Sequence, residues 1–380
     1  GGARSEVAIL YRSNAQSRVF EERLMQFAIP YRVYGGLRFF ERAEIKDALA
    51  YLRLTANRDD DASFERVVNH PPRGIGGRTL EMVRQQARDN STSLWRAAIT
   101  VANEKLLPAR ACNAIIAFLN LVDELAAGTG RLPLAEQVEH VMHPSGLVDH
   151  FSKEKGEKGQ ARLENLQELV NAAREFEHDP DSDMDPLSEF LSHAALEAGE
   201  GQADAWEDCV QLMTLHSAKG LEFPLVFLCG LEEGLFPHQR SVEEAGRLEE
   251  ERRLCYVGIT RARQQLVLTC AERRRLFGTE TYCLPSRFID EIPKELVFEV
   301  RPKPGISMPR AATANVDRSF KPTSAGGLQL GQHVRHAKFG DGVIMNCEGQ
   351  GSGARVQVNF SRAGTKWLVL ANANLDSVGA

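Results

Sequence analysis

The stretch Leu212-Met-Thr-Leu-His-Ser-Ala-Lys-Gly-Leu-Glu-Phe223 ends a short apolar run and continues as a polar loop with a glycine. The apolar run begins at Val210, and a second one, Leu225-Val-Phe-Leu-Cys229, follows the loop. A helical pattern over residues 248–257 and a third apolar run over 265–270 come next. Apolar runs that alternate with helices are typical of strands in a parallel sheet. The expected fold class is therefore α/β.

The same sheet is expected to begin near the N-terminus. Residues Val7–Tyr11 form another strand-like run, and a polar segment, Arg12–Arg18, follows it. Residues 45–52 then carry an apolar stripe at helical spacing, and the pattern stays mostly helical up to about residue 206. We therefore expect an α/β domain made of residues 1–34 and 207–300, interrupted by an inserted helical subdomain at 35–206.

The last eighty residues differ in composition from the rest of the chain. Residues 301–327 contain four prolines among Ser, Thr, Ala and Gly, which is the composition of an extended linker. Residues 328–380 contain short apolar runs such as Arg355–Phe360 between glycine-rich turns. That pattern predicts a small β-barrel of the SH3 or Tudor type at 328–380.

The composition of the 380 residues, 43% hydrophobic and 26% charged, is typical of a globular chain. No apolar run approaches the ~20 residues of a membrane helix, so no membrane partner is expected. The seven cysteines form no Cys-x-x-Cys pair, which favours free thiols in a reducing cytoplasm and argues against a zinc ribbon. Residue 1 is glycine rather than methionine, and we expect the chain to be a fragment of a longer protein.

The net charge of −6 is unevenly distributed. Residues 175–210 hold twelve acidic and no basic side chains, whereas residues 301–380 have a net charge of +6. Such a balance does not exclude nucleic acid, because phosphate binding depends on local basic patches. The acidic run Glu177–Pro186 lacks the glycine and terminal glutamate of a calcium loop, so we expect an exposed loop. His333 and His336 have no third ligand nearby, and no metal site is predicted.

Three segments carry groups suited to phosphate chemistry, and each has a simpler interpretation. The loop at 215–223 follows a strand, and ligands of open α/β sheets bind at the carboxyl ends of strands; an ordinary turn is the alternative. Glu249–Arg263 ends in Thr-Arg-Ala-Arg, where Arg261 would stabilise a phosphoryl group unless these charges only form surface ion pairs. Pro71–Thr79 contains a Gly-x-Gly turn that would hold a nucleic-acid phosphate or simply cap a helix.

The sequence also lacks a part that ATP hydrolysis requires. A P-loop needs Gly-Lys followed by Ser or Thr, and the 380 residues contain no Gly-Lys dipeptide. The run Ala117–Glu124 imitates an apolar strand with a magnesium-binding Asp-Glu pair, but it lies within a helical pattern. We therefore interpret Ala117–Glu124 as part of a helix and not as a magnesium site.

Taken together, these motifs resemble those of superfamily 1 DNA helicases of the UvrD/Rep/PcrA type, over essentially the whole chain. The resemblance rests on five segments that occur in the order of that family. They are Tyr11-Arg-Ser-Asn-Ala-Gln-Ser-Arg18, Gly35-Gly-Leu-Arg-Phe-Phe-Glu-Arg-Ala-Glu-Ile-Lys-Asp47, Gly74-Ile-Gly76, Leu215-His-Ser-Ala-Lys-Gly-Leu-Glu-Phe223 and Tyr256-Val-Gly-Ile-Thr-Arg-Ala262.

The resemblance implies a role for each of these segments. The α/β domain would be the second RecA-like domain of a 3′–5′ DNA helicase, with ATP bound between it and a first motor domain. Arg261 would be the catalytic arginine that reaches the γ-phosphate, and Glu222 would contact the nucleotide ribose. The single-strand path would be lined by Arg12, Asn14, Lys46, Thr214 and His216. Duplex backbone would contact Gly74, Gly76 and Thr79 of the inserted subdomain.

The family's cofactors are ATP and Mg²⁺, and its partners are single-stranded DNA, DNA junctions, RNA polymerase through the C-terminal barrel, and excision and mismatch repair factors. The family's first motor domain holds the P-loop and the magnesium site, and this sequence contains neither, so we expect the chain alone to be inactive. A non-catalytic module that tethers DNA and RNA polymerase is the alternative function. A helicase–nuclease subunit is disfavoured, because no carboxylate cluster follows residue 300.

Overall fold

The computed structural model describes residues 2–130, 132–199, 207–243, 246–276 and 279–300, together with parts of 324–377. The chain divides into two compact units, Gly1–Cys270 and Ala271–Ala380. This division falls thirty residues before the expected end of the α/β domain at residue 300. Most of the expected linker, residues 301–323 and 326–327, lies outside the described residues.

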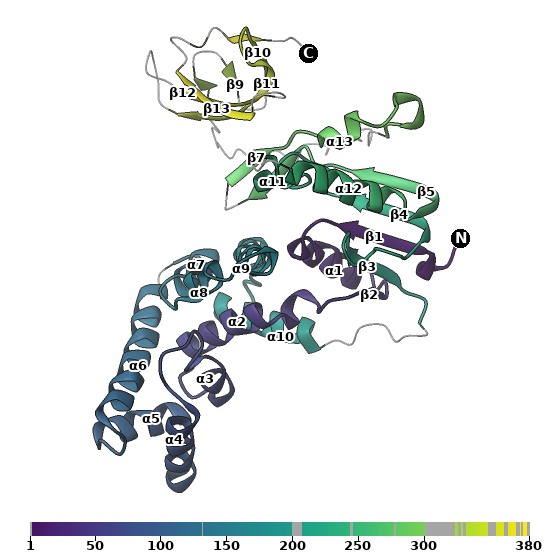
Figure 1. Ribbon diagram of the computed structural model, residues 1–380. Helices are drawn as coiled ribbons and strands as arrows, with labels where there is room; N and C mark the ends of the chain where they lie inside the picture. The colour runs from purple at the N-terminus through teal and green to yellow at the C-terminus, as the bar shows by residue number, and fades with distance from the viewer. Residues whose placement is uncertain are drawn as a thin grey trace. The chain divides into compact units, whose positions relative to one another are not determined.

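The first unit contains a five-stranded sheet in the order β2-β3-β1-β4-β5, and every pairing is parallel. This confirms the expected α/β class (Figure 1). The strands are β1 (Val7–Tyr11), β2 (Tyr31–Val33), β3 (Val210–Thr214), β4 (Phe223–Cys229) and β5 (Ala262–Thr269). Their helices are α1 (Ser17–Gln26), α11 (Gln239–Glu243) and α12 (Arg247–Ile259).

β1 occupies the centre of the sheet because its side chains are apolar on both faces. Ala8, Leu10 and Tyr11 are fully buried, and β1 pairs with β3 on one side and β4 on the other. The chain therefore crosses from one side of β1 to the other between Thr214 and Phe223. This connection, residues 215–222, starts at the carboxyl end of β3 and finishes at the amino end of β4. It therefore runs from the end of the sheet where the parallel strands finish to the end where they start.

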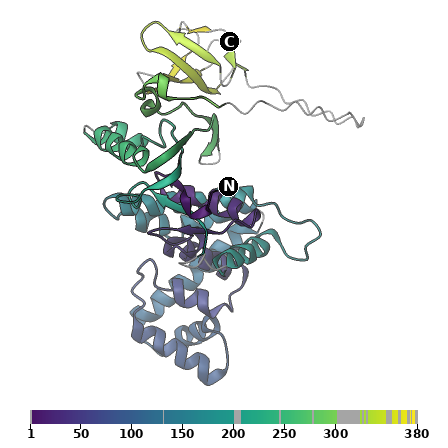
Figure 2. The same ribbon diagram turned by 90° about the vertical axis from the view of Figure 1, so that its right-hand side faces the viewer.

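Between β2 and β3 the chain forms a block of helices that share one apolar core, in which Ile45, Phe64, Phe118 and Leu169 are almost fully buried. The helices farthest from the sheet are α4–α6 (Figures 1 and 2). Their bounds are α2 (Ala43–Ala56), α3 (Asp61–Val67), α4 (Gly77–Asn90), α5 (Leu94–Asn103), α6 (Ala109–Thr129), α7 (Leu134–Met142), α8 (Leu147–Ser152), α9 (Glu157–Glu175) and α10 (Pro186–Gly199). Short 3₁₀ helices, η1 (Arg4–Glu6), η2 (Asn14–Gln16) and η3 (Phe39–Glu41), flank the first strands.

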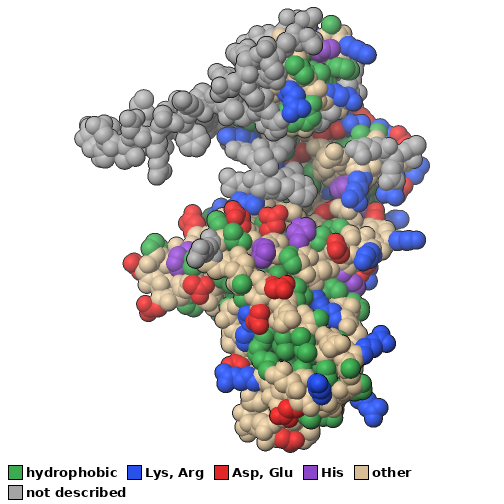
Figure 3. All heavy atoms as spheres, turned by 90° about the vertical axis from the view of Figure 1, so that its left-hand side faces the viewer, with side chains coloured by type: hydrophobic (Ala, Val, Ile, Leu, Met, Phe, Trp, Pro, Cys, Tyr) green, Lys and Arg blue, Asp and Glu red, His purple; other side chains and the backbone are tan. Residues whose placement is uncertain are grey.

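Among the described residues, one helix, α6, is long and apolar enough to cross a membrane, although no apolar run of that length was expected. Its buried residues include Ile115, Phe118, Val122 and Leu125, which follow helical spacing and belong to the core of the block. An amphipathic core helix meets the same length and composition criteria, so this packing accounts for the apolar content. The same region shows a gathering of apolar side chains on one face in the space-filling view (Figure 3).

The second unit contains a five-stranded antiparallel sheet in the order β13-β12-β11-β10-β14. Its core is formed by Val334, Ile344, Val356, Val358 and Phe360. This confirms the small C-terminal β domain expected from the turn pattern. The elements of this unit are β6 (Arg273–Leu276), β7 (Thr279–Tyr282), α13 (Arg287–Asp290), η4 (Lys294–Leu296), β8 (Ser324–Ala325), β9 (Leu328–Gln329), β10 (His333–His336), β11 (Gly340–Glu348), β12 (Arg355–Phe360), β13 (Gly364–Val369) and β14 (Leu375–Ser377).

Candidate functional site

The side chains predicted to act on phosphates lie at opposite ends of the strands of the parallel sheet. We call these the carboxyl edge, where the strands finish, and the amino edge, where they start. Arg12 follows the carboxyl end of β1, and Thr214 and His216 lie at the carboxyl end of β3. Glu222 and Arg261 instead precede β4 and β5, at the amino edge. We had expected phosphate chemistry at the carboxyl ends of the strands. The two residues assigned to the nucleotide lie at the other edge, because residues 215–222 cross the sheet before β4 begins.

The guanidinium group of Arg261 is held in place by its own neighbourhood. Nε donates to the carbonyl oxygen of Val257 at 2.9 Å, Nη1 donates to the carbonyl of Leu221 at 2.8 Å, and Nη2 donates to the Thr260 hydroxyl at 3.0 Å. A guanidinium has five N–H groups, so one hydrogen on Nη1 and one on Nη2 have no partner among the described residues. A half-buried arginine fixed in this way keeps two charged N–H donors for an anion.

Glu222 is brought next to Arg261 by the backbone. The Arg261 side chain binds the carbonyl of Leu221, and the Arg261 carbonyl accepts a 2.9 Å hydrogen bond from the Phe223 amide. These contacts enclose Glu222 between them, and its carboxylate is exposed. The two residues assigned to the nucleotide, 39 positions apart in the sequence, therefore form one local site.

Arg12 is engaged by a carboxylate of the same unit. Its Nε lies 3.0 Å and its Nη2 2.7 Å from Oε1 of Glu251, a buried residue of α12. Burial alone would raise the pKa of Glu251, but hydrogen bonding and the charge of Arg12 outweigh it and hold that pKa below its ordinary value. Arg12 thus fastens α12 to the carboxyl end of β1, and its predicted DNA contact stays a prediction.

The other residues predicted for the single strand lie on exposed surface near the carboxyl edge or on the helical block. Asn14 begins η2 and is exposed, and its carbonyl accepts a 3.0 Å hydrogen bond from Arg42. Thr214 is half-buried and pairs with the Ser217 hydroxyl at 3.0 Å, while His216 beside it is exposed. Lys46 is exposed on α2.

The predicted duplex contact forms the N-terminus of α4, far along the helical block. Gly74 has a φ of +80°, a conformation that favours glycine, and Gly76 is the residue that caps α4. Nothing lies within 4 Å of a Cβ placed on Gly74 or Gly76, so both backbones are open to a ligand. Thr79 is buried, and its amide donates to the carbonyl of Gly76 at 3.0 Å.

A polar junction between the sheet and the helical block was missed at the sequence level. Glu164 of α9 accepts hydrogen bonds from Ser13 and Gln160, and its Oε1 lies 3.4 Å from Nε2 of His238. Burial would raise the pKa of Glu164, but the hydrogen bonds from His238, Ser13 and Gln160 lower it below the ordinary value. These partners come from segments more than seventy residues apart, so no local pattern could reveal them.

The buried guanidinium of Arg42 makes a second contact across the same junction. Nη2 binds the Ser17 hydroxyl at 2.6 Å, and Nη1 binds Oδ1 of Asn165 at 2.8 Å. Burial lowers the pKa of Arg42, a cost that the charge of Glu21 partly offsets. Arg18 extends the junction, with Nε 2.6 Å from Glu168 and Nη2 2.7 Å from Glu175. The junction therefore fixes α9 and α2 to the first strand and helix of the sheet domain.

The residues present do not fit a magnesium ion. Within the described ranges no group of three His, Cys, Asp or Glu side chains could hold a metal. The run Ala117–Glu124 lies inside α6, as expected, and Asp123 pairs with Nε of Arg58 at 3.0 Å. The N–H donors of Arg261 suit a phosphoryl oxygen, whereas the part of the chain that the structure describes offers no cluster for a metal.

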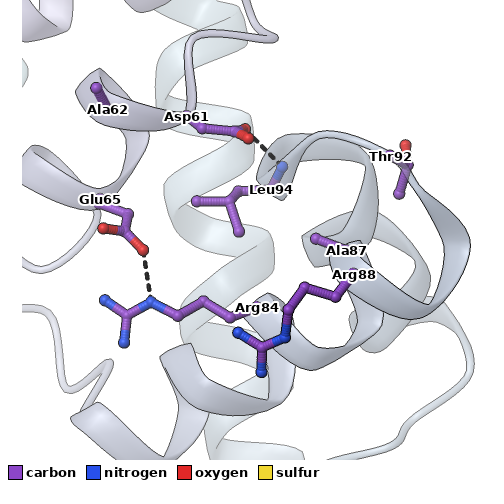
Figure 4. Close-up of a pocket in the computed structure, with 8 residues that line it drawn as sticks. All are labelled: Asp61, Ala62, Glu65, Arg84, Ala87, Arg88, Thr92 and Leu94. Carbon is purple, nitrogen blue, oxygen red and sulfur yellow. Dashed lines mark hydrogen bonds and ion pairs between the residues drawn. The ribbon is translucent and has the colours of Figure 1, made fainter.

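A surface cavity of about 440 Å³ lies between α3, α4 and α5 of the helical block. Figure 4 shows that Glu65 pairs with Arg84 across it and that Asp61 accepts a hydrogen bond from the Leu94 amide. Its remaining lining residues are Ala62, Ala87, Arg88 and Thr92. No residue predicted for DNA or nucleotide lines this cavity, and its acidic and basic side chains neutralise each other.

Comparisons with known proteins agree with this arrangement. The family model described as the UvrD-like helicase C-terminal domain matches residues 1–273, and the PcrA/UvrD tudor domain matches residues 330–375. The chain is 59% identical to DNA helicase II of Escherichia coli (strain K12), over 100% of this chain and 52% of that protein. It is 40% identical to ATP-dependent DNA helicase PcrA of Bacillus subtilis (strain 168), over 98% of this chain and 52% of that protein.

The chain therefore spans about half the length of the curated relatives it matches. The first family model covers the parallel sheet, the helical block, Glu222 and Arg261 in one match. The second covers most of the antiparallel sheet of the second unit. On sequence, fold and the placement of these residues, the chain belongs to the UvrD-like helicase family.

Proposed function

We propose that this chain is the C-terminal part of an ATP-dependent 3′–5′ DNA helicase, which translocates on single-stranded DNA and unwinds duplex DNA during repair. The observation that carries the proposal is the hydrogen bond from Arg261 to the carbonyl of Leu221, which places Glu222 beside Arg261 at one sheet edge, opposite the edge that bears Thr214 and His216. The names of the relatives, DNA helicase II and ATP-dependent DNA helicase PcrA, support the same activity.

In the complete enzyme, ATP would supply the free energy for movement. Arg261 would place its two remaining N–H donors against a phosphoryl oxygen, where a fixed guanidinium stabilises negative charge as it develops. Its other donors hold the carbonyls of Leu221 and Val257, so any displacement of the guanidinium acts directly on residues 215–222. That segment begins directly after Thr214 and contains His216, and both residues would contact the DNA strand.

The chain by itself should not hydrolyse ATP. It contains no Gly-Lys dipeptide to build a P-loop, and its described residues offer no magnesium site. Arg261 stabilises a transition state only when another domain presents the nucleotide and its metal opposite the guanidinium. We place the complete protein in the cytoplasm, consistent with free cysteines, four of which are buried.

A second function is favoured by the Tudor match of the C-terminal unit. We propose that this unit docks on RNA polymerase and that excision and mismatch repair factors are further partners. A chain that only tethers DNA and RNA polymerase would need no P-loop, so the non-catalytic module stays the alternative to a motor half.

Binding of single-stranded DNA tests the proposed function. We expect the purified chain to bind a labelled oligonucleotide in fluorescence anisotropy, and His216→Ala to weaken binding about 3- to 10-fold, the effect of one lost hydrogen bond. The matched control is His143→Ala on the helical block, an exposed histidine outside the predicted path, which should bind like wild type. Equal affinity of His216→Ala and wild type would contradict the assigned path.

A further inference from the structure

We define the α8–α9 loop as residues 152–158, which run from the last residue of α8 into the first turn of α9. It carries a basic cluster that none of the assigned motifs includes. Lys153, Lys155 and Lys158 are exposed, and none of them forms a hydrogen bond or ion pair with a described residue. The two acidic residues of the loop behave differently. Glu154 pairs with Nη1 of Arg162, and Glu157 lies 3.8 Å from Nη2 of Arg12. The loop therefore presents three unpaired positive charges while its negative charges face cations.

The loop is held rigidly against the helix that follows it. A Cβ on Gly159 would lie 2.4 Å from the carbonyl oxygen of Glu154 and 2.9 Å from that of Phe151, so the start of α9 packs directly on the end of α8. Phe151 is buried, and its carbonyl accepts a 3.1 Å hydrogen bond from the Glu154 amide. The lysines therefore project from a fixed support, which reduces the conformational entropy lost when they bind a ligand.

The position of the loop relates it to the carboxyl edge of the sheet. Glu157 reaches Arg12 at the end of β1, and Glu164, two turns further along α9, accepts a hydrogen bond from Ser13. Arg162 lies 3.9 Å from Glu44, which precedes Lys46 by two residues in α2. The loop thus adjoins the residues predicted to line the single-strand path, on the side of the helical block.

We propose that Lys153, Lys155 and Lys158 bind the phosphate backbone of single-stranded DNA and extend its path from the sheet edge onto the helical block. This inference rests on the proposed function, which places the strand at Arg12, Asn14 and His216. Lysine ammonium groups bind phosphates as point charges and do not read sequence, which suits a translocating enzyme.

The chemistry of the loop favours a nucleic acid over an acidic protein. Its exposed residues are Ser152, Lys153, Lys155, Gly156, Glu157 and Lys158, with no apolar side chain among them. Protein interfaces derive most of their affinity from buried apolar and aromatic anchors, which this surface lacks. Phosphate contacts need only positive charge and counterion release.

The test measures the salt dependence of single-strand binding by the full chain. The variant Lys153→Gln/Lys155→Gln/Lys158→Gln should reduce the slope of log K against log salt by about 2, since each single-strand phosphate contact contributes roughly 0.7. The loss of single-strand affinity relative to wild type should be largest at low salt and should disappear near 1 M salt. The arginine variant Lys153→Arg/Lys155→Arg/Lys158→Arg should retain the wild-type slope, because it keeps the charge.

The control is Arg96→Gln/Lys105→Gln/Arg110→Gln, which removes the same charge from exposed positions on α5, α6 and the turn between them, far from the sheet (Figure 1). It should leave the slope unchanged. If the lysine variant keeps the wild-type slope while His216→Ala weakens binding, the inference is wrong and the proposed function stands. If the lysine variant loses affinity only for blunt duplex DNA, the assignment of these lysines to the single strand is wrong. A wild-type chain that does not bind single strands would overturn the proposed function as well.

Discussion

At the scale of single residues, the ion pair between Arg12 and Glu251 holds α12 against the carboxyl end of β1. Both side chains are largely buried, and their closest atoms are 2.7 Å apart. The remaining oxygen contacts of Glu251 come from the His238 amide and the Ser241 hydroxyl, each at 3.3 Å. Removing either partner of the pair leaves an uncompensated charge in a poorly solvated site.

We expect Arg12→Ala to lower the free energy of unfolding by about 3 kcal/mol, the cost of breaking a buried pair. The double variant Arg12→Ala/Glu251→Gln should recover part of that loss, because the orphaned carboxylate is gone. Urea denaturation of the four proteins in a double-mutant cycle measures the coupling. Additive effects of the two substitutions would contradict a pairing that stabilises the fold.

The same pair predicts a pH dependence. Because the pKa of Glu251 is lower in the folded chain than its ordinary value of 4.5, the pair stabilises the fold above that value, and this contribution is lost as the pH falls through the folded pKa. Glu251→Gln should therefore flatten the decline of unfolding free energy below about pH 4.5. The exposed Glu139→Gln is the control and should reproduce the wild-type curve. A wild-type decline in Glu251→Gln would show that other groups cause it.

Substitution of Arg261 should lower the rate of ATP hydrolysis and leave the affinity for DNA unchanged. In the complete helicase, Arg261→Lys should reduce kcat for ATP hydrolysis by about 10³ or more, because an ammonium with three N–H groups cannot bind two carbonyls and still offer two donors to a phosphate. The affinity for single strands should stay within about twofold, since the DNA residues lie at the opposite edge; a change of twofold is below 0.5 kcal/mol. Steady-state ATPase assays and anisotropy separate the two effects. A parallel loss of DNA affinity would argue against separate edges.

At the scale of elements, the fit of α12 on the sheet depends on one small residue. Gly258 lies against Leu215 and Leu228, and a Cβ there would be 2.5 Å from Cδ2 of Leu215 and 3.3 Å from both methyl groups of Leu228. Leu215 and Leu228 are fully buried, so they have little room to move. This close approach sets the position of the segment that ends in Arg261.

Gly258→Ala should therefore lower the free energy of unfolding by about 1–3 kcal/mol, the range for overpacking a core. Gly77→Ala is the matched control, because it is also a helical glycine and nothing lies within 4 Å of a Cβ placed there. That change should be neutral or stabilise the chain by up to about 1 kcal/mol through helix propensity. Thermal or urea unfolding distinguishes the two, and equal effects would contradict the packing argument.

The elements show which features the sequence could predict. β1 begins and ends where its apolar run does, because both of its faces are buried. β5 begins at Ala262 rather than at the predicted residue 265, since its first positions, Arg263 and Gln264, are polar and exposed on an edge strand. Periodicity reports burial, so it identifies central strands well and misses the exposed ends of edge strands.

The candidate site was harder to predict than the sheet. Motif order assigned Arg261 and Glu222 to the nucleotide, but the sequence did not reveal that both lie at the amino ends of their strands. The contacts of Arg261 with Leu221 and of Arg12 with Glu251 join residues 40 and 239 positions apart. Such pairings depend on how distant segments come together in the folded sheet domain, which no local pattern encodes.

At the scale of the whole molecule, the proposed function assigns one half of an ATP site and a DNA-binding edge to the first unit, and the second unit contains a Tudor-like sheet. The relatives it matches are about twice as long. Under the proposed function, Arg261 therefore acts only when another domain presents a nucleotide. The inserted block, fixed to the sheet through Arg42, Arg18 and Glu164, would move with that half.

DNA-stimulated ATP hydrolysis by the purified chain tests this claim most directly. We predict no turnover above background with single-stranded DNA, ATP and Mg²⁺ present, and turnover that depends on Arg261 once a domain with a P-loop is supplied. Turnover by the chain alone, abolished by Arg261→Ala, would contradict the account.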